Sequence, residues 1–213
     1  NGDQFVFTRA LSAAGYATAL FGKWHLRGWP TDEFDEWQVL EGAGGQGHYY
    51  NPEFLCSDNQ QRQVEGYSTD VITDVSIDWM DKQSQTKQPF LLMCQYKSPH
   101  IHRIPPPRHM NILDGQQVAE PVTLFDTYEG RSSYAKKCWM RLFGMSDHVL
   151  NITPPQGEYD GGKRPYQFLG RMTQSQRIAF HQAYDSENKD YRRLLAEGVL
   201  KERSLDRYKY QRF

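Results

Sequence analysis

The sequence of 213 residues has no apolar run long enough to cross a bilayer, so we expect no membrane-spanning segment. It has no excess of charge either, since 25 Lys and Arg residues stand against 26 Asp and Glu residues. Proteins that bind nucleic acid usually carry a basic excess or stripe, so nucleic acid is not expected as a partner. Cysteine is scarce as well: the three Cys residues stand far apart, without the spacing of a zinc site or a disulfide framework.

Several catalytic motifs are also missing. The sequence contains no GxSxG nucleophile elbow and no phosphate-binding P-loop. It contains no Cys-x-Pro-x-Arg or Ser-x-Pro-x-Arg stretch. Its carboxylates are scattered, and neither a paired acid and base nor an acidic cation site can be assembled from them. We therefore assign no metal ligand in this chain.

What is present is a repeated order of helix, strand and loop, which predicts an α/β fold. Apolar residues between 7 and 14 fall on one helical face, and the apolar run at 16–21 follows as a buried strand. A second helix begins at Ser68–Asp70, which offer N-caps, and the apolar run at 89–96 follows as a second strand. We expect both strands in one largely parallel sheet, with the loops that follow them at the same edge.

The rest of the sequence gives weaker signals. Residues 28–66 are predicted to be loop, because they are rich in glycine, proline and aromatic residues. A helix is expected around Ser133–Phe143, and a capping box at Thr173–Gln176 opens another helix that runs to about Glu187. The remaining residues are charged and helix-prone as far as Phe213.

Lys23 and His25 follow the first strand directly, in Gly22-Lys23-Trp24-His25-Leu26. Lysine carries a compact charge that can neutralise the oxygens of an oxyanion, and histidine exchanges a proton near neutral pH. In isolation, a Lys and a His after a strand are more often solvated loop residues. In the context of the preceding Gly15–Phe21 stretch, we interpret both as catalytic candidates.

His100 occupies the matching position after the second strand and is the third catalytic candidate. Lys97, His102 and Arg103 are candidate substrate contacts, although His102 and Arg103 also fit an ordinary surface. His100 and His102 do not indicate a metal site, because side chains two residues apart on an extended segment point to opposite sides.

A loop rich in glycine and aromatic residues, Gly45–Pro52, supplies two more candidate substrate contacts, His48 and Tyr50. Exposed aromatic and amide side chains suit sugar rings, and glycine lets the backbone come close to a ligand. A loop folded over the core by its own tyrosines is an equally good interpretation of the same residues.

The pattern Gly15-Tyr16-x-Thr18-x-x-x-Gly22-Lys23-Trp24-His25-Leu26 closely resembles the second signature of the formylglycine-dependent sulfatases. The helix start at Gly66–Asp74 and the later Pro99-His100 occur in the order seen in that family, and Gly170–Thr173 and Tyr208–Arg212 are similar to it. The resemblance implies an alkaline-phosphatase-like α/β fold, with a mixed, mostly parallel sheet flanked by helices. It also implies hydrolysis of sulfate esters, most closely those of the sulfated amino sugars in glycosaminoglycans, including glucosamine 6-sulfate.

The resemblance also implies a role for each catalytic candidate. Lys23 would bind sulfate oxygens and stabilise the growing negative charge. His25 would hydrogen-bond the formylglycine hydroxyl and assist release of sulfate, and His100 would donate a proton to the departing sugar oxygen. Formylglycine, made from Cys or Ser, and calcium are the cofactors that the family implies, and a sulfated carbohydrate is the implied partner.

Residues 1–213 are accordingly expected to be part of a sulfatase catalytic domain, incomplete at both ends. The nucleophile segment and paired calcium aspartates belong before Asn1, and further calcium ligands and a second sulfate-binding lysine belong beyond Phe213. The chain alone is predicted to be inactive. The family implies a secreted, periplasmic or lysosomal protein, although no signal peptide opens this sequence. A non-catalytic glycan-binding relative, and a phosphodiesterase or phosphatase of the same superfamily, are the alternatives.

Overall fold

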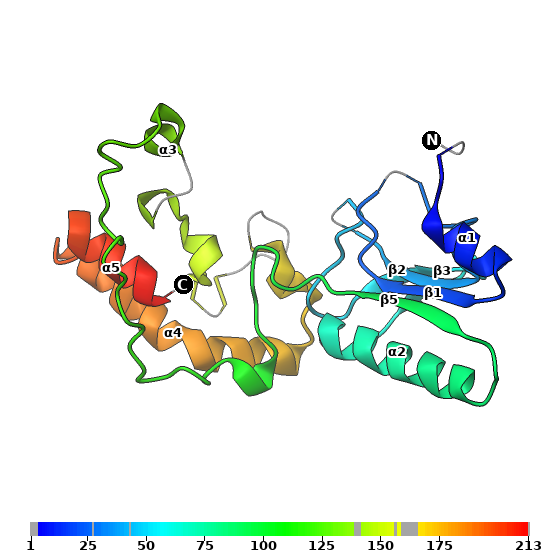
Figure 1. Cartoon of the computed structure of the whole chain (residues 1–213). Helices are drawn as coiled ribbons and strands as arrows, with labels where there is room; N and C mark the ends of the chain where they lie inside the picture. The colour runs from blue at the N-terminus through cyan, green and yellow to red at the C-terminus, as the bar shows by residue number, and fades with distance from the viewer. Residues whose placement is uncertain are drawn as a thin grey trace. The chain divides into compact units, whose positions relative to one another are not determined.

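The computed structural model describes residues 4–26, 28–42, 44–138, 142–155, 157–158 and 166–212 (Figure 1). The chain divides into two compact units, Asn1–His100 and Ile101–Phe213. Within the described residues, no helix combines the length and the apolarity that a membrane span requires.

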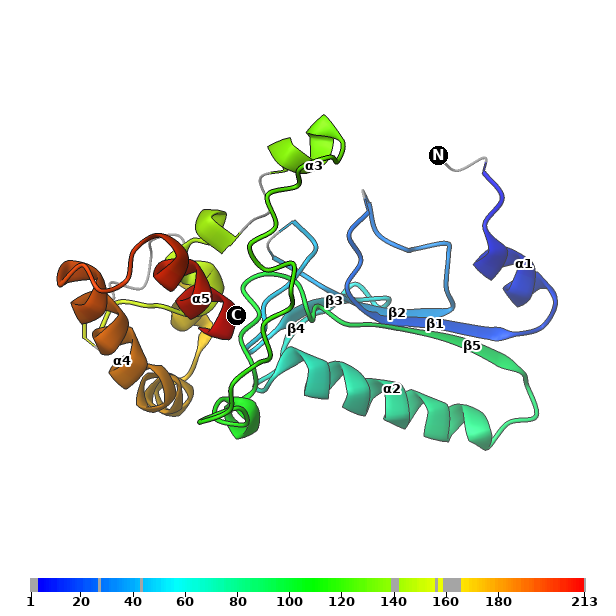
Figure 2. The same cartoon turned by 60° about the vertical axis from the view of Figure 1, so that its left-hand side comes forward.

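The first unit is built on a five-stranded mixed sheet with the order β4-β3-β2-β1-β5. Strand β1 pairs in parallel with β2 and with β5, whereas β2 with β3 and β3 with β4 are antiparallel pairs. Helices α1 and α2 lie on opposite faces of this sheet (Figures 1 and 2). The elements are α1 (Phe7–Ala13), β1 (Ala17–Gly22), β2 (Glu36–Leu40), β3 (Glu53–Cys56), β4 (Gln61–Gln63), α2 (Ser68–Ser84) and β5 (Phe90–Gln95).

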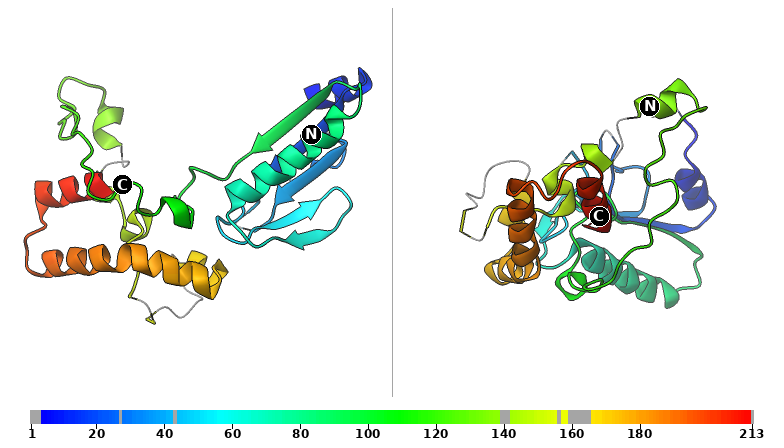
Figure 3. Two further views of the ribbon diagram at one scale, coloured as in Figure 1. Left: turned by 90° about the horizontal axis from the view of Figure 1, so that it is seen from below. Right: turned by 90° about the vertical axis from the view of Figure 1, so that its left-hand side faces the viewer.

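Strand β1 is the centre of this unit, because all six of its residues are buried. Alternate side chains of a strand point to opposite faces of the sheet. Phe21 packs with Ile72 and Trp79 of α2 on one face, while Leu20 packs with Trp37 on the other. The left view of Figure 3 shows α2 running along the sheet that it covers. Because β1 is covered on both faces, its residues form a continuous apolar run, and this run predicted the strand.

The predicted helices and strands on both sides of residues 28–66 are confirmed, and so is the parallel pairing of β1 with β5. The prediction that 28–66 is loop was wrong, because β2, β3 and β4 all lie there. These strands are only five, four and three residues long, and all three residues of β4 are exposed, so no hydrophobic pattern marked them. The predicted N-cap was also wrong: α2 begins at Ser68, its N-cap is Tyr67, and no side chain caps it.

The regular elements in the described residues of the second unit are all helices, joined by turns and irregular segments. It contains η1 (Pro107–His109), α3 (Ser133–Lys137), η2 (Leu142–Gly144), η3 (Asp147–Leu150), η4 (Gln167–Arg171), α4 (Gln174–Ala196) and α5 (Glu202–Arg212). The capping box is confirmed, since Thr173 and Gln176 exchange both of its hydrogen bonds, and α4 continues past the expected end at Glu187. The helix expected at Ser133–Phe143 is shorter, and residues 139–141 of that range lie outside the described residues.

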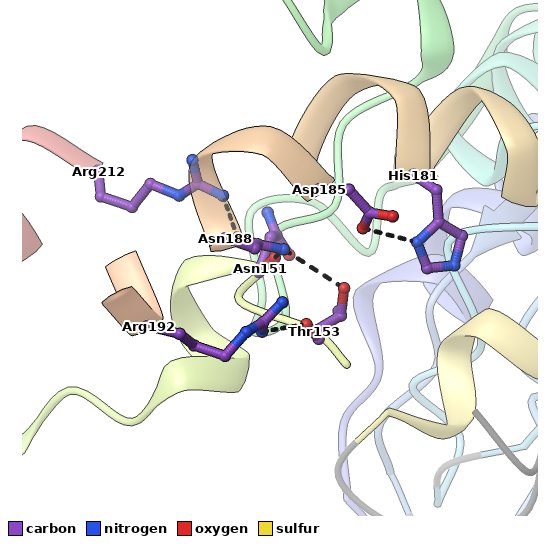
Figure 4. Close-up of polar contacts among 7 residues, drawn as sticks. All are labelled: Asn151, Thr153, His181, Asp185, Asn188, Arg192 and Arg212. Carbon is purple, nitrogen blue, oxygen red and sulfur yellow. Dashed lines mark hydrogen bonds and ion pairs between the residues drawn. The ribbon is translucent and has the colours of Figure 1, made fainter. Parts of the chain in front are cut away.

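Helices α4 and α5 lie side by side in this unit (Figures 1 and 3) and are joined by apolar and polar contacts. The rings of Tyr191 and Tyr208 stack with their centroids 5.2 Å apart. Asn188 is fully buried and donates to the Asn151 carbonyl oxygen at 3.2 Å. Arg212 in turn donates to the Asn188 Oδ1 at 2.8 Å (Figure 4). Buried polar groups are costly unless they are hydrogen-bonded, so this amide fixes how the two helices pack.

Replacing Asn188 with Ala removes one of the acceptors of the Arg212 guanidinium and the donor to the Asn151 carbonyl oxygen. Because both partners are left short of a hydrogen bond in a buried place, we expect a loss of about 3 kcal/mol in the free energy of unfolding. Urea denaturation measures this loss. Lys189→Ala, at the next and exposed position of α4, is the control and should change stability by less than about 0.5 kcal/mol. Equal stability of the two variants would contradict the assignment.

Candidate functional site

The register between β1 and β5 places two loops at one edge of the sheet. Gly22, the last residue of β1, pairs with Gln95, the last residue of β5, and the strands are parallel. The backbone N–H of Lys23 then donates to the Gln95 carbonyl oxygen at 2.7 Å, which extends the ladder by one residue. Lys23 to His25 and Tyr96 to His100 therefore leave the sheet from the same edge, as the sequence predicted.

Gly22 is required where β1 ends. Its φ is +116°, a backbone conformation that L side chains rarely adopt, and a Cβ atom there would lie 1.9 Å from the Gln95 carbonyl oxygen. Glycine alone permits the close approach that brings the Lys23 N–H onto the neighbouring strand.

The loop between β2 and β3 lies against both strand-end loops. The Lys23 ammonium donates to Gln46 Oε1 at 3.3 Å, and a Cβ atom on Gly45 would lie 2.7 Å from the Trp24 carbonyl oxygen. On the other side, the Tyr49 hydroxyl donates a hydrogen bond to the His100 carbonyl oxygen. This loop, which the sequence marks by its glycine and aromatic content, thus connects Lys23 to the loop that carries His100.

Two lysines at this edge repel one another. Lys97 is 8% exposed, and its ammonium lies 5.2 Å from the centroid of the Tyr49 ring. Burial, and secondly the positive charge of Lys23, lower the pKa of Lys97 to about 8. In the part of the chain that the structure describes, neither lysine forms an ion pair with a carboxylate. A pair of cations held together without a counter-charge is the electrostatic setting of an anion site.

His25 and His100 are both exposed, so their imidazoles are accessible to a ligand. His100 is held by its backbone, since its N–H donates to the Lys97 carbonyl oxygen at 3.0 Å and closes a turn. The structure therefore places Lys23, His25 and His100 in one unit, on loops from one sheet edge. That arrangement can bind a tetrahedral anion and supply a proton beside it.

The candidate substrate contacts divide between the units. His48 is half-buried in the first unit, where a Cβ atom on Gly42 would lie 2.8 Å from its Nε2. Tyr50 is 2% exposed and packs edge-on against Tyr67, so the structure shows a packing role for it. This agrees with the second interpretation of the aromatic loop.

His102 and Arg103 belong to the second unit. The His102 ring lies edge-on against the His148 ring, with centroids 4.9 Å apart. Arg103 has a φ of +35°, in the left-handed region. Their role as substrate contacts stays a prediction.

Gln46 and Tyr49 contact the candidate residues but were not among the candidates. Both lie in the aromatic loop, and nothing in the sequence distinguishes the tyrosine that reaches His100 from its neighbour Tyr50. Among the described residues, no group of three His, Cys, Asp or Glu side chains is placed to hold a metal ion.

The sulfatase family matches residues 3–141 of this chain. The chain is 36% identical over 220 residues to an N-acetylglucosamine-6-O-sulfatase of Bacteroides thetaiotaomicron, covering 100% of this chain and 38% of that protein. It is 27% identical over 142 residues to an ulvan-active sulfatase of Formosa agariphila, covering 61% of this chain and 27% of that protein.

Similarity extends to a solved structure. The chain matches the structure of BT4656 in complex with its substrate D-glucosamine-2-N,6-O-disulfate with a TM-score of 0.90 and 36% identity. The match covers 100% of this chain and 42% of that one. The chain therefore spans about two fifths of the length of the N-acetylglucosamine-6-O-sulfatase and of the BT4656 chain.

Replacing Gly22 with Ala should destabilise the first unit by about 3 kcal/mol or more, because the new methyl group meets the Gln95 backbone. Gly15→Ala, two residues before the start of the same strand, is a matched control: its φ is +90°, but nothing lies within 4 Å of a Cβ atom there. It should show only the backbone strain, about 1 kcal/mol. Urea denaturation compares the two variants, and equal losses would show that the close approach at Gly22 is unimportant.

Proposed function

Because the chain belongs to the sulfatase family, we propose that it is the central part of a sulfuric ester hydrolase that acts on a sulfated carbohydrate. The alkaline-phosphatase-like α/β fold expected from the sequence is confirmed by the structural match. The observation that carries the proposal is the pair Lys23 and Lys97, brought together at one sheet edge without a carboxylate partner among the described residues. Such a pair attracts an anion such as sulfate.

Each catalytic candidate has a distinct part in this proposal. Lys23 contacts the sulfate oxygens and stabilises the charge that develops on them as the S–O bond breaks. His100, as an imidazolium, donates its proton to the sugar oxygen that leaves. His25, two residues beyond Lys23, is a second group that holds a proton beside the sulfate.

The nucleophile and the metal ion do not come from the described residues. Sulfatases use a formylglycine, which supplies the attacking oxygen, but this sequence contains no Cys-x-Pro-x-Arg or Ser-x-Pro-x-Arg stretch. The described residues also contain no group that could hold a metal ion. We propose that the formylglycine and a calcium ion are held by other parts of the full-length protein, and that this chain alone is inactive.

The substrate we propose is an amino sugar that carries a sulfate on its 6-hydroxyl group. Support comes from the N-acetylglucosamine-6-O-sulfatase and from the structure that holds D-glucosamine-2-N,6-O-disulfate, both 36% identical to this chain. Lys97, His48, His102 and Arg103 are the proposed substrate contacts of this chain. A secreted, periplasmic or lysosomal location is proposed from the family alone.

Replacing Lys23 with Met, or His100 with Ala, in the full-length protein should lower kcat on glucosamine 6-sulfate by about 100-fold or more. Sulfate release measures the rate. Lys87→Met is the control for the lysine, because Lys87 is exposed and precedes β5 at the other end of the strand. His109→Ala, an exposed histidine of the second unit, is the control for His100. Binding of the sugar without hydrolysis would favour a non-catalytic glycan-binding protein, and hydrolysis of phosphate esters in preference would favour a phosphatase.

Sulfate affinity should fall as the pH rises through about 8, because the pKa of Lys97 is lowered to about 8 and the residue loses its charge above that value. Sulfate keeps its charge over this range, and an ordinary lysine stays protonated to about pH 10. Isothermal titration of the protein with inorganic sulfate between about pH 7.5 and 9.5 measures the change. Lys97→Met should bind sulfate more weakly and without the step near pH 8, whereas Lys87→Met should keep it. A constant affinity across the range would show that Lys97 does not contact the anion.

A further inference from the structure

Tyr49 makes contacts on three sides at the candidate site. Its side chain is 5% exposed, and its hydroxyl donates to the His100 carbonyl oxygen. Its ring stacks on Tyr67, with centroids 5.9 Å apart, and the Lys97 ammonium lies 5.2 Å above it. The buried Tyr49 side chain therefore contacts both the Lys97 ammonium and the backbone of His100.

Tyr49 is itself fixed to the start of α2. Its carbonyl oxygen accepts a hydrogen bond from the Ser68 N–H at 2.8 Å, and Tyr67, on which its ring stacks, is the N-cap residue of that helix. The second residue of α2 is Thr69, and its hydroxyl lies 3.3 Å from the Ser98 hydroxyl. The turn that carries His100 is thus held from the first turn of α2, directly at Ser98 and through Tyr49 at His100.

We propose that Tyr49 is a positioning residue that sets the place of the His100 imidazole relative to the leaving oxygen of the substrate; this inference rests on the proposed function. A hydrogen bond to the His100 carbonyl oxygen restrains the backbone from which the imidazole projects. A general acid must lie within hydrogen-bond reach of the oxygen that it protonates, and a misplacement of about 1 Å can cost about 100-fold in rate. Tyr49 acts through His100 and need not touch the substrate.

A positioning role makes the rate loss depend on the leaving group. A sugar hydroxyl is a poor leaving group and needs the proton from His100, whereas a nitrophenol leaves readily as its anion. Tyr49→Phe keeps the ring, the stacking on Tyr67 and the contact with Lys97, and removes only the hydroxyl. We expect a loss of about 10-fold in kcat on glucosamine 6-sulfate, less than about 3-fold on 4-nitrophenyl sulfate, and an unchanged KM for the sugar.

The experiment uses the full-length protein and a double-mutant cycle. The variants are Tyr49→Phe, His100→Ala and the two combined, each assayed on the sugar ester and on the aryl ester. Because Tyr49 acts through His100, the double variant should be no slower on the sugar ester than His100→Ala alone. Tyr96→Phe is the matched control: the Tyr96 hydroxyl lies 3.0 Å from the Thr73 hydroxyl, so the variant removes a contact to α2 but none to His100. It should leave kcat on both esters unchanged.

The outcomes are distinguishable. Losses that are equal on both esters, or that multiply in the double variant, would show that Tyr49 supports only the fold and would overturn the inference. An unchanged rate for Tyr49→Phe would overturn it as well. A wild-type protein that hydrolyses neither ester, or a His100→Ala variant as fast as wild type, would overturn the proposed function itself, and the inference with it.

Discussion

The parallel pairing of β1 with β5 is the interaction on which the candidate site depends. Its register sets Gly22 opposite Gln95, so both strands end at the same level of the sheet. A slip of one residue would move the buried side chains of a strand to the opposite face, which the packing of Phe21 and Leu20 in separate clusters opposes. The hydrophobic core therefore fixes the register, and the register fixes where the two polar loops begin.

The third loop completes the site from a different part of the sheet. Strands β2 and β3 carry it, and because β2 pairs with β1, the loop emerges beside Lys23. Gln46 reaches the lysine and Tyr49 reaches the histidine loop, so side chains distant in the sequence become neighbours through strand order alone. The start of α2 adds a firm support, since Tyr67 and Ser68 both contact Tyr49. Rigid elements thus hold polar groups that themselves lie on loops.

The sequence predicted those parts of the fold in which local pattern and burial agree. Strands β1 and β5 are apolar runs, α1 and α2 show helical periodicity, and the capping box marks the start of α4. The short strands β2 to β4 carry no such pattern, because five, four and three residues are too few to display one and β4 is exposed throughout.

Lys23, His25 and His100 could be chosen as candidates because each follows a predicted strand. The contact of Tyr49 with His100 and the repulsion between Lys23 and Lys97 depend on tertiary distances, which no local pattern reports.

The two ammonium groups at one edge have a consequence for the sulfatase reaction that we propose. A sulfate ester carries a single negative charge, whereas the free sulfate ion carries two. A site with two cations is therefore better matched to the charge that exists once the ester bond has broken than to the charge of the bound ester. In the proposed reaction, the same match strengthens binding of the released ion and slows the departure of inorganic sulfate. Burial and the charge of Lys23 lower the pKa of Lys97 to about 8, so a rise in pH through that value removes one of the two charges and weakens this hold on the ion.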